Sequence, residues 1–341
     1  MENAHGESPS PTQQLHLAIT SYWRTQVIGT VARLGIADLL ADGARDSDSL
    51  ASELSVHPEA LFRLMRAGLA TGIFVAFAER TFALTPMGEG LCSNTPGSLR
   101  ELAIIQSSPS HWLPWGHLTE AIRTGSAPIQ AALGSDIWEH FAKNPDEAEH
   151  FARSMGDWSE MVSSQVARHV DFSAFARVAD IGGSHGDLLA QVLRAHPSCR
   201  GILFELPQVA ESAKPVLASR GLASRVEVVT GNFFEPGIPA ADAYLLKHIL
   251  HDWEDDACTT LLRRLHEAAP AGARLFVVEM VIPDNRTPDI THLMDLNMLV
   301  VANGRERTYN EFQALLGATA WKVHRLIPTQ SGTSIIEAVK A

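Results

Sequence analysis

The spacing of apolar residues predicts a helical start to the chain. From Leu15 to Leu40 apolar side chains recur at helical intervals, which predicts one long amphipathic helix ending near Asp42 and Gly43. The preceding residues, 1–14, are polar and contain Pro and Ser, so we expect a disordered tail there.

Two short helices and a hairpin follow this first helix. The segment from Asp46 to Ser49 opens a helix that runs through Leu54, and Pro58 begins a second one that Gly72 stops. Residues 73–84 then have the pattern of a β-hairpin. This order is the winged-helix pattern, which raises two hypotheses, DNA binding and a packing or dimerisation module.

The charge of the winged-helix segment favours the second hypothesis. Between Asp46 and Gly90 six acidic residues stand against three basic ones, Arg63, Arg66 and Arg80. Two arginines on the second helix without further basic support would contact few phosphates. We therefore expect this segment to serve packing or dimerisation.

The chain from residue 98 onward has a different pattern of apolar residues. Residues 98–170 predict further helices, rich in aromatic side chains that are mostly core. From Arg177 short apolar segments alternate with helical ones. The apolar segments are RVADI, GILFEL, VEVVT, AYLLK, RLFVVEMVI, 322–326 and 334–339, with helices over 188–195, 209–219 and 257–269. Such βαβ alternation predicts an α/β fold with a doubly wound parallel sheet, in which ligands bind beyond the carboxyl ends of the strands.

Composition narrows the class of protein. The 341 residues are 45% hydrophobic and 19% charged, as in an ordinary globular protein. The net charge of −12 disfavours nucleic acid and anionic membranes as partners. Three scattered cysteines, without CxxC spacing, fit a reducing compartment. The start of the chain lacks the features of a signal peptide, and no apolar run reaches the roughly 18 residues of a membrane span. We therefore expect a cytoplasmic location.

The string Asp180-Ile-Gly-Gly-Ser-His-Gly186 at the end of the first strand has three interpretations. A dinucleotide site requires GxGxxG, which the string does not match. Gly182-x-Ser184-x-Gly186 matches the GxSxG nucleophile elbow of hydrolases, but the upstream chain is helical and lacks an HGGG-type oxyanion loop. The third interpretation is a nucleoside cofactor without phosphates.

Residues at the next strand ends support the nucleoside interpretation. Glu205 closes the second strand, where a carboxylate can accept hydrogen bonds from both ribose hydroxyls. Asn232 and Phe233 follow the third strand and offer an amide and an aromatic face to an adenine ring.

The fourth strand runs into Lys247-His-Ile-Leu-His251-Asp-Trp253. Glu279 ends the fifth strand and Glu306 lies in a later loop, and a histidine between two carboxylates is typical of a general base. A metal site on His248-x-x-His251-Asp252 would lack both the HExxH pattern and a defined third ligand, so we expect no metal.

These motifs together resemble the caffeic-acid-type family of S-adenosylmethionine-dependent O-methyltransferases, in its bacterial natural-product branch. The matching strings are DIGGSHG, LFELP, GNFFE, LKHILHDW, VVEMVIPD, NGRERT and FARSMGDWS, in family order and over nearly the whole chain. The resemblance implies a class I methyltransferase, Rossmann-like catalytic domain over 171–341. It also implies a winged-helix dimerisation domain over 15–100 and linking helices that wall a pocket over 101–170.

The resemblance also implies a function and residue roles. The enzyme would methylate a hydroxyl of an aromatic, polycyclic secondary metabolite as a homodimer, without a metal. Methylation of a heteroaromatic nitrogen, or a non-methylating hydroxylase or decarboxylase, are the alternatives. His251 would be the base, flanked by Glu279 and Glu306. The cofactor would contact Gly182 and Gly183 through its methionine part, Glu205 through its ribose, Asn232 and Phe233 through its adenine, Lys247 near its sulfonium, and Ser159. The acceptor would contact Phe141, Met155, Trp158, Met294, Asn297 and Met298.

Three positions depart from the family pattern. Ser184 and His185 stand where Gly-Thr or Gly-Ser is common, and no role is assigned to His185. Asn232 replaces the usual Asp; it can still accept a hydrogen bond from an adenine amine but lacks the charge, so we expect weaker cofactor binding.

Overall fold

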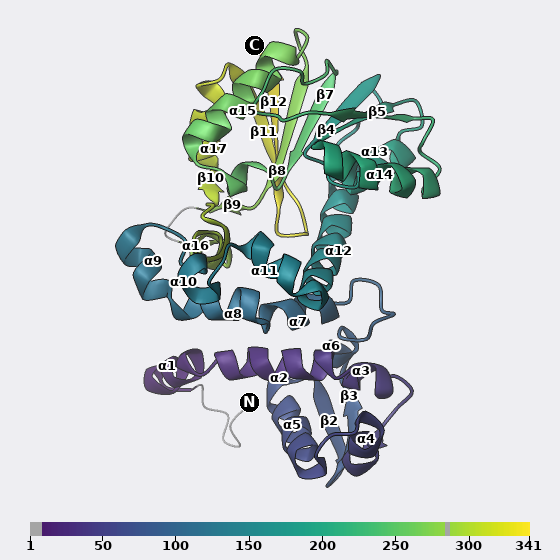
Figure 1. Cartoon of the computed structure of the whole chain (residues 1–341), viewed down its shortest axis with the longest axis vertical. Helices are drawn as coiled ribbons and strands as arrows, with labels where there is room; N and C mark the ends of the chain where they lie inside the picture. The colour runs from purple at the N-terminus through teal and green to yellow at the C-terminus, as the bar shows by residue number, and fades with distance from the viewer. Residues whose placement is uncertain (1–8, 284–286) are drawn as a thin grey trace. The chain divides into compact units, whose positions relative to one another are not determined.

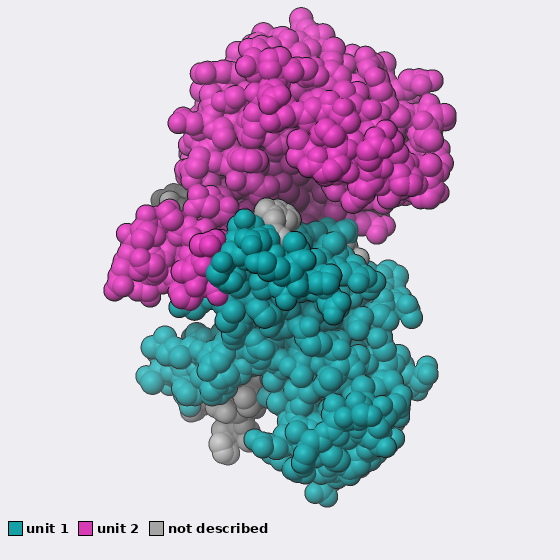
Figure 2. All heavy atoms as spheres, in the orientation of Figure 1, with its two compact units in different colours: residues 1–116, 133–157 teal, residues 117–132, 158–341 magenta. Residues whose placement is uncertain are grey.

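The computed structural model describes residues 9–283 and 287–341, and Figure 1 labels its elements. The chain forms two compact units, coloured separately in Figure 2. The first comprises Met1–Gly116 and Leu133–Asp157, and the second comprises His117–Ala132 and Trp158–Ala341.

The first unit is mostly helical. Its elements are α1 (Pro11–Ile19), α2 (Tyr22–Arg33), α3 (Ile36–Leu39), β1 (Arg45–Asp46), α4 (Ser47–Leu54), α5 (Pro58–Thr71), β2 (Phe74–Ala78), β3 (Thr81–Leu84), α6 (Pro86–Glu89), α7 (Arg100–Gln106), α8 (Pro109–Gly116), α11 (Ile137–Lys143) and the first part of α12 (Pro145–His169).

The winged-helix pattern predicted from the sequence is present. Asp46 caps α4 by accepting hydrogen bonds from two backbone N–H groups, Pro58 begins α5, and Gly72 ends it in the left-handed conformation at φ 83°. The three strands form a small antiparallel sheet in the order β1-β3-β2. Its core contains Val31, Ile36, Leu50, Met65 and Phe82, together with their neighbours.

The prediction of one helix from Leu15 to Leu40 is wrong, because the structure has three. The hydroxyls of Thr20 and Ser21 bond to backbone carbonyls of α1, which competes with continuation of the helix. The second break is at Gly35, which has a left-handed φ of 66°.

The predicted disordered tail is wrong at 11–14, which belong to α1. Ser10 and Gln13 form a capping box, and Pro11 occupies the first helical position, so this polar stretch carries a helix-start signal. The part of the predicted tail at 1–8 lies outside the described residues.

The second unit contains the large sheet. Its elements are α9 (Leu118–Thr124), α10 (Ile129–Leu133, whose last residue belongs to the first unit), the remainder of α12, β4 (Arg177–Ile181), α13 (Asp187–Ala195), β5 (Arg200–Glu205), α14 (Pro207–Ser219), β6 (Val226–Thr230), β7 (Ala243–Lys247), the 3-10 helix η1 (Leu250–Asp252), α15 (Asp255–Ala268), β8 (Arg274–Glu279), β9 (Val281–Ile282), α16 (Thr291–Ala302), β10 (Arg307–Thr308), α17 (Tyr309–Gly317), β11 (Trp321–Pro328) and β12 (Ser334–Lys340).

The seven strands of this sheet lie in the order β11-β12-β8-β7-β4-β5-β6. Strands β4 to β8 pair in parallel, as the alternation of segments predicts. The chain moves outward from β4 through β5 to β6 and then returns to place β7 on the other side of β4. Ligands bind at such a switch point in open α/β sheets, so the loops after β4 and β7 are where a site is expected.

Side chains alternate between two cores, one on each face of the sheet. Ala179, Tyr244 and Leu246 face a core shared with α15 and α17, whereas Val178 and Leu245 face one shared with α12, α13 and α14. Figure 1 shows helices on both faces.

The C-terminal strands differ from a simple parallel series. The string RLFVVEMVI divides at Met280 into β8 and β9, and β9 pairs with β10 instead of the large sheet. Strands β11 and β12 form an antiparallel hairpin whose second strand also runs antiparallel to β8.

Two further features concern the cysteines and the length of the helices. Cys92, Cys199 and Cys258 are free and buried. Within 9–283 and 287–341, every helix is too short or too polar to cross a membrane.

Candidate active site

The turn after β4 brings its backbone close to a buried carboxylate. Gly182 and Gly186 have positive φ values of 69° and 77°, and so has Ser184 at 53°. A Cβ atom on Gly183 would lie 2.4 Å from Cγ of Asp180. The turn therefore requires glycine at 183 to stay folded onto Asp180.

Glu205, at the end of β5, is held by the same turn. Its Oε1 accepts a hydrogen bond from the Ser184 backbone N–H at 2.9 Å, and its Oε2 accepts one from the Leu206 N–H at 2.7 Å. Each oxygen retains a lone pair for a further donor, so the carboxylate is oriented and can still receive a pair of hydroxyls.

Asp180 is buried and Lys247 is half-buried beside this turn. Both carboxylate oxygens of Asp180 are buried, and burial raises the pKa of Asp180 to about 7 against the opposing charge of Lys247. Burial also lowers the pKa of Lys247, whose Nζ donates to Oγ of Ser159 at 2.7 Å. The oriented carboxylate of Glu205, which can still accept from a pair of hydroxyls, suits the ribose of a nucleoside ligand and so fits S-adenosylmethionine.

Asn232 and Phe233, which follow β6, contact residues close to them in the sequence. Oδ1 of Asn232 accepts a hydrogen bond from the Phe234 N–H at 3.0 Å, and the half-buried ring of Phe233 packs edge-on against Phe234. His185, to which the sequence assigns no role, lies between Oγ of Ser184 at 3.3 Å and Oγ of Ser212, on α14, at 3.1 Å. It therefore ties the glycine-rich turn to α14.

His251 lies in η1, surrounded by carboxylates. Its Nδ1 lies 3.1 Å from Oε1 of Glu306 and 3.7 Å from Oε2 of Glu279, and its Nε2 lies 3.5 Å from Oδ1 of Asp252. Burial alone would lower the pKa of His251. The charge of Glu279 and the hydrogen bond to Glu306 outweigh it and raise that pKa to about 9.

The two glutamates differ in their surroundings. Glu279 is 0% exposed, and its Oε1 accepts hydrogen bonds from the N–H groups of Ile249 and Leu250. Burial opposes its ionisation, but the charge of His251 and the hydrogen bonds keep its pKa below the ordinary value. Burial raises the pKa of Glu306, and the bond from His251 offsets only part of that. The pKa values of the two glutamates are therefore shifted in opposite directions, and Glu279 is the stronger acid.

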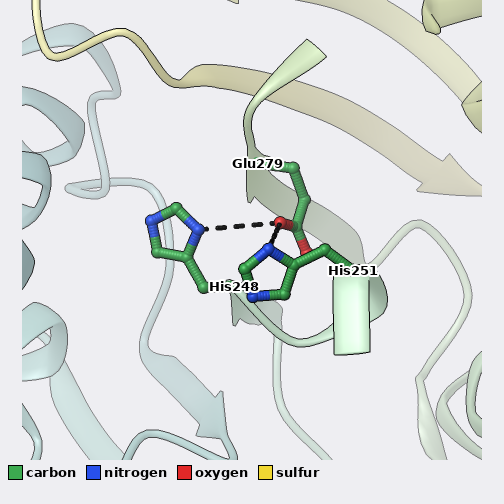
Figure 3. A group of neighbouring side chains, drawn as sticks. All are labelled: His248, His251 and Glu279. Atoms are coloured by element: carbon green, nitrogen blue, oxygen red, sulfur yellow. Dashed lines mark ion pairs between the residues drawn. The ribbon is translucent and has the colours of Figure 1, made fainter. Parts of the chain in front are cut away.

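A second histidine shares Glu279 with His251, as Figure 3 shows. Nδ1 of His248 lies 3.7 Å from Oε2 of Glu279, and its Nε2 accepts a hydrogen bond from the indole N–H of Trp158 at 3.4 Å. Burial lowers the pKa of His248, whereas the pKa of His251 is raised. The sequence offers His248 only a role as a metal ligand, and no local pattern reveals its contact with Trp158.

The metal alternative rests on the same three side chains. His248, His251 and Glu279 offer ligand atoms within 4.8 Å of one another. A ligating imidazole must be unprotonated, so the raised pKa of His251 opposes metal binding. The oxygen of Glu279 that faces both histidines is Oε2, 3.7 Å from each Nδ1, whereas Oε1 accepts two backbone N–H groups.

The candidate acceptor residues fall in two groups. Met294, Asn297 and Met298 lie together on α16, and Trp158 contacts His248 in the same unit. Phe141 and Met155 belong to the other unit, where the ring of Phe141 stacks on Phe151. The structure therefore brings four of the six candidates into the unit that holds His251.

Comparison with known proteins gives consistent results over nearly the whole chain. The model of the O-methyltransferase domain matches residues 115–322, and that of the O-methyltransferase dimerisation domain matches 17–94. A phenazine O-methyltransferase, PhzM, of Lysobacter antibioticus is 36% identical, over 94% of each chain. A mitomycin biosynthesis 6-O-methyltransferase of Streptomyces lavendulae is 38% identical, over 94% of this chain and 92% of that one. The crystal structure of CalO1, a methyltransferase in calicheamicin biosynthesis in its SAH-bound form, has a TM-score of 0.86 at 28% identity, covering 98% and 100% of the two chains.

Proposed function

Because the chain belongs to the O-methyltransferase family and is an S-adenosylmethionine-dependent O-methyltransferase, we propose that it methylates a hydroxyl of an aromatic small molecule, with His251 as general base. The observation that carries the assignment of the base is the position of His251 between Glu279 and Glu306. The names of the phenazine and mitomycin relatives support a polycyclic secondary metabolite as acceptor.

The residues around the β4 turn would hold the cofactor. Gly182 and Gly183 would lie against its methionine part, Glu205 would accept the ribose hydroxyls, and Lys247 with Ser159 would lie near the sulfonium. Asn232 and Phe233 would contact the adenine, with Asn232 contributing less because its Oδ1 already accepts from the backbone. When bound, S-adenosylmethionine supplies a methyl group that its sulfonium already activates.

His251 would remove the proton from the acceptor. With Nδ1 donating to Glu306, the lone pair of Nε2 is available to the acceptor hydroxyl. A phenol has a pKa near 10, and the pKa of His251 is raised to about 9, so proton transfer is nearly balanced. Glu279 and Glu306 would stabilise the imidazolium that forms.

The acceptor would bind against α16 and Trp158. Met294, Met298 and Trp158 offer apolar and aromatic surface for a planar ring, and Asn297 offers an amide to orient it. The assignment of Phe141 and Met155 to the acceptor rests on the family resemblance alone, because both belong to the other compact unit.

The N-terminal part would serve assembly. The match of the dimerisation-domain model to residues 17–94 supports a homodimer. Along the chain, we assign residues 15–100 to dimerisation, 101–170 to linking helices and 171–341 to catalysis. The buried, free cysteines suit a reducing compartment, so we assign a cytoplasmic location.

One experiment tests the function directly. The purified protein is incubated with S-adenosylmethionine and a panel of phenolic polycycles and heteroaromatic amines, and products are identified by mass spectrometry and NMR. We expect a mass gain of one methyl group on a phenolic oxygen, absent when the cofactor is omitted. Methylation confined to ring nitrogen would support the N-methyltransferase alternative. Cofactor binding without transfer to any acceptor would contradict the proposal.

A further inference from the structure

Four consecutive residues, Gly304 to Arg307, lie along the turn that carries His251. Each of the four contacts that turn, and only the contact of Glu306 is accounted for by the mechanism above. We call residues 304–307 the clasp.

The first two residues of the clasp contact the backbone of His251. The Arg305 N–H donates a hydrogen bond to the His251 carbonyl oxygen at 2.8 Å. A Cβ atom on Gly304 would lie 2.3 Å from the same oxygen, so only glycine permits this approach. The clasp therefore fixes the main chain of His251 as well as its ring.

Arg307 secures the residues on both sides of His251. Its Nη1 donates to the Leu250 carbonyl at 2.7 Å, and its Nη2 donates to the Trp253 carbonyl at 2.7 Å. Nε and Nη2 also bind Oδ1 of Asp255, at the start of α15, at 3.0 and 2.7 Å. The side chain is 1% exposed, so water cannot replace these bonds if it is removed.

The clasp also joins the turn to α16. The Glu306 N–H donates to Oδ1 of Asp295, and the Gly304 N–H donates to the Met298 carbonyl at 3.1 Å. Asp295 and Met298 belong to the helix that carries three acceptor candidates. The clasp therefore connects the turn that carries His251 to α16.

On this basis we propose that Arg307 is a positioning residue, which sets the place of the His251 imidazole between Glu279 and Glu306 by holding the carbonyls of Leu250 and Trp253. The inference rests on the proposed role of His251 as base. Lysine cannot replace Arg307 fully, because an ammonium lacks the planar fork that reaches two carbonyls and a carboxylate at once.

The test measures the pKa of His251 directly. Arg307→Met and Arg307→Lys are prepared with 13C-labelled histidine, and the ring is titrated by NMR without cofactor or acceptor; the His251→Gln spectrum identifies the signal. The charged or titratable groups facing the ring are Asp252, Glu279, Glu306 and His248. We expect the His251 pKa to fall by about one unit or more toward the ordinary 6.5 in Arg307→Met, and by less in Arg307→Lys.

The matched control is Arg225, another arginine that holds backbone carbonyls. Its guanidinium donates to the carbonyls of Leu193, His196 and Cys199, away from the turn. Arg225→Met should lower the melting temperature and leave the His251 pKa unchanged. A purely structural Arg307 would behave in the same way.

Kinetics provide the second readout. In Arg307→Met we expect kcat to fall by about 10²-fold, as for a misplaced catalytic group, while the Kd of S-adenosylhomocysteine stays within about threefold. An unchanged His251 pKa in both Arg307 variants overturns the inference and leaves the proposed function intact. A shifted pKa together with full activity of His251→Gln would instead refute the base and retain the positioning role. If Arg307→Met does not fold, Arg307→Lys decides.

Discussion

At the scale of single residues, the environment of His251 determines how the site responds to pH. A general base must be unprotonated before it can act, and Glu279 and Glu306 stabilise the protonated form. The same carboxylates that make the imidazole a stronger base therefore reduce the fraction of enzyme that is ready to react at neutral pH.

The pH profile follows from this balance. Because the pKa of His251 is raised to about 9, kcat/KM should increase with pH through neutrality, with its acid limb above the ordinary histidine value of about 6.5. In Glu279→Gln the limb should move to lower pH, since one stabilising charge is lost. The measurement is a pH–rate profile of both proteins. A limb at or below about 6.5 in the wild type would contradict the electrostatic argument.

Removal of the base should affect turnover more than binding. His251→Ala should lower kcat by about 10² to 10⁴-fold, the usual contribution of a positioned acid or base. Steady-state kinetics give kcat, and calorimetry with S-adenosylhomocysteine gives cofactor affinity, which should barely change. A variant with wild-type kcat would refute the assignment.

At the scale of elements, the turn between β4 and α13 shows how a short glycine-rich string becomes a binding surface. The turn is folded onto Asp180, and the Ser184 N–H within it orients Glu205 from the neighbouring strand. A side chain at position 183 would separate the turn from Asp180 and displace the N–H that holds Glu205.

Gly183→Ala should therefore weaken cofactor binding. The added Cβ would lie 2.4 Å from Cγ of Asp180, and overpacking of this kind costs about 1–3 kcal/mol. We expect the Kd of S-adenosylmethionine to rise roughly 5- to 150-fold by calorimetry, with little change in kcat at saturation. Gly317→Ala is the control, because nothing lies within 4 Å of its Cβ position. Equal affinities in the two variants would show that the turn tolerates a side chain.

At the scale of the whole molecule, the first two helices present apolar side chains that the single chain leaves exposed. Leu15, Ile19 and Trp23 are 62%, 65% and 56% exposed, and the last two lie in the segment matched by the dimerisation model. The winged-helix segment, by contrast, uses Arg80 internally, since its guanidinium binds Asp48 and stacks on Phe62. These observations favour assembly over nucleic-acid binding for the N-terminal part.

Charges placed on this apolar surface should separate the proposed homodimer. The double variant Ile19→Glu/Trp23→Glu should halve the mass measured by sedimentation or light scattering, because buried charges without partners oppose association. Arg264→Glu, on the surface of α15, changes the net charge by the same amount and should leave the mass unchanged. An undiminished mass in the double variant would place the dimer contact elsewhere.

Local patterns predicted much of the fold. The strand ends at Ile181, Glu205 and Lys247 are predicted correctly, since a buried parallel strand is a short apolar segment whose end the sequence marks. The single N-terminal helix was wrong because the break at Gly35 depends on one residue within a continuous apolar pattern. The start of α1 is wrong for a different reason, because the polar composition of this stretch predicts a tail and only the local capping box of Ser10 and Gln13 marks a helix.

By itself, the sequence determined the helices and strands of the α/β sheet, the glycine-rich turn and the set of polar residues at the strand ends, because these depend on periodicity and turn chemistry over a few residues. Only the tertiary structure decided which of them meet. Glu306 contacts His251 across 55 residues of sequence, and Trp158 donates a hydrogen bond to His248. Arg307 holds the turn that carries His251. The raised pKa of His251 is likewise a tertiary property, because it arises from burial and from charges that chain folding brings together.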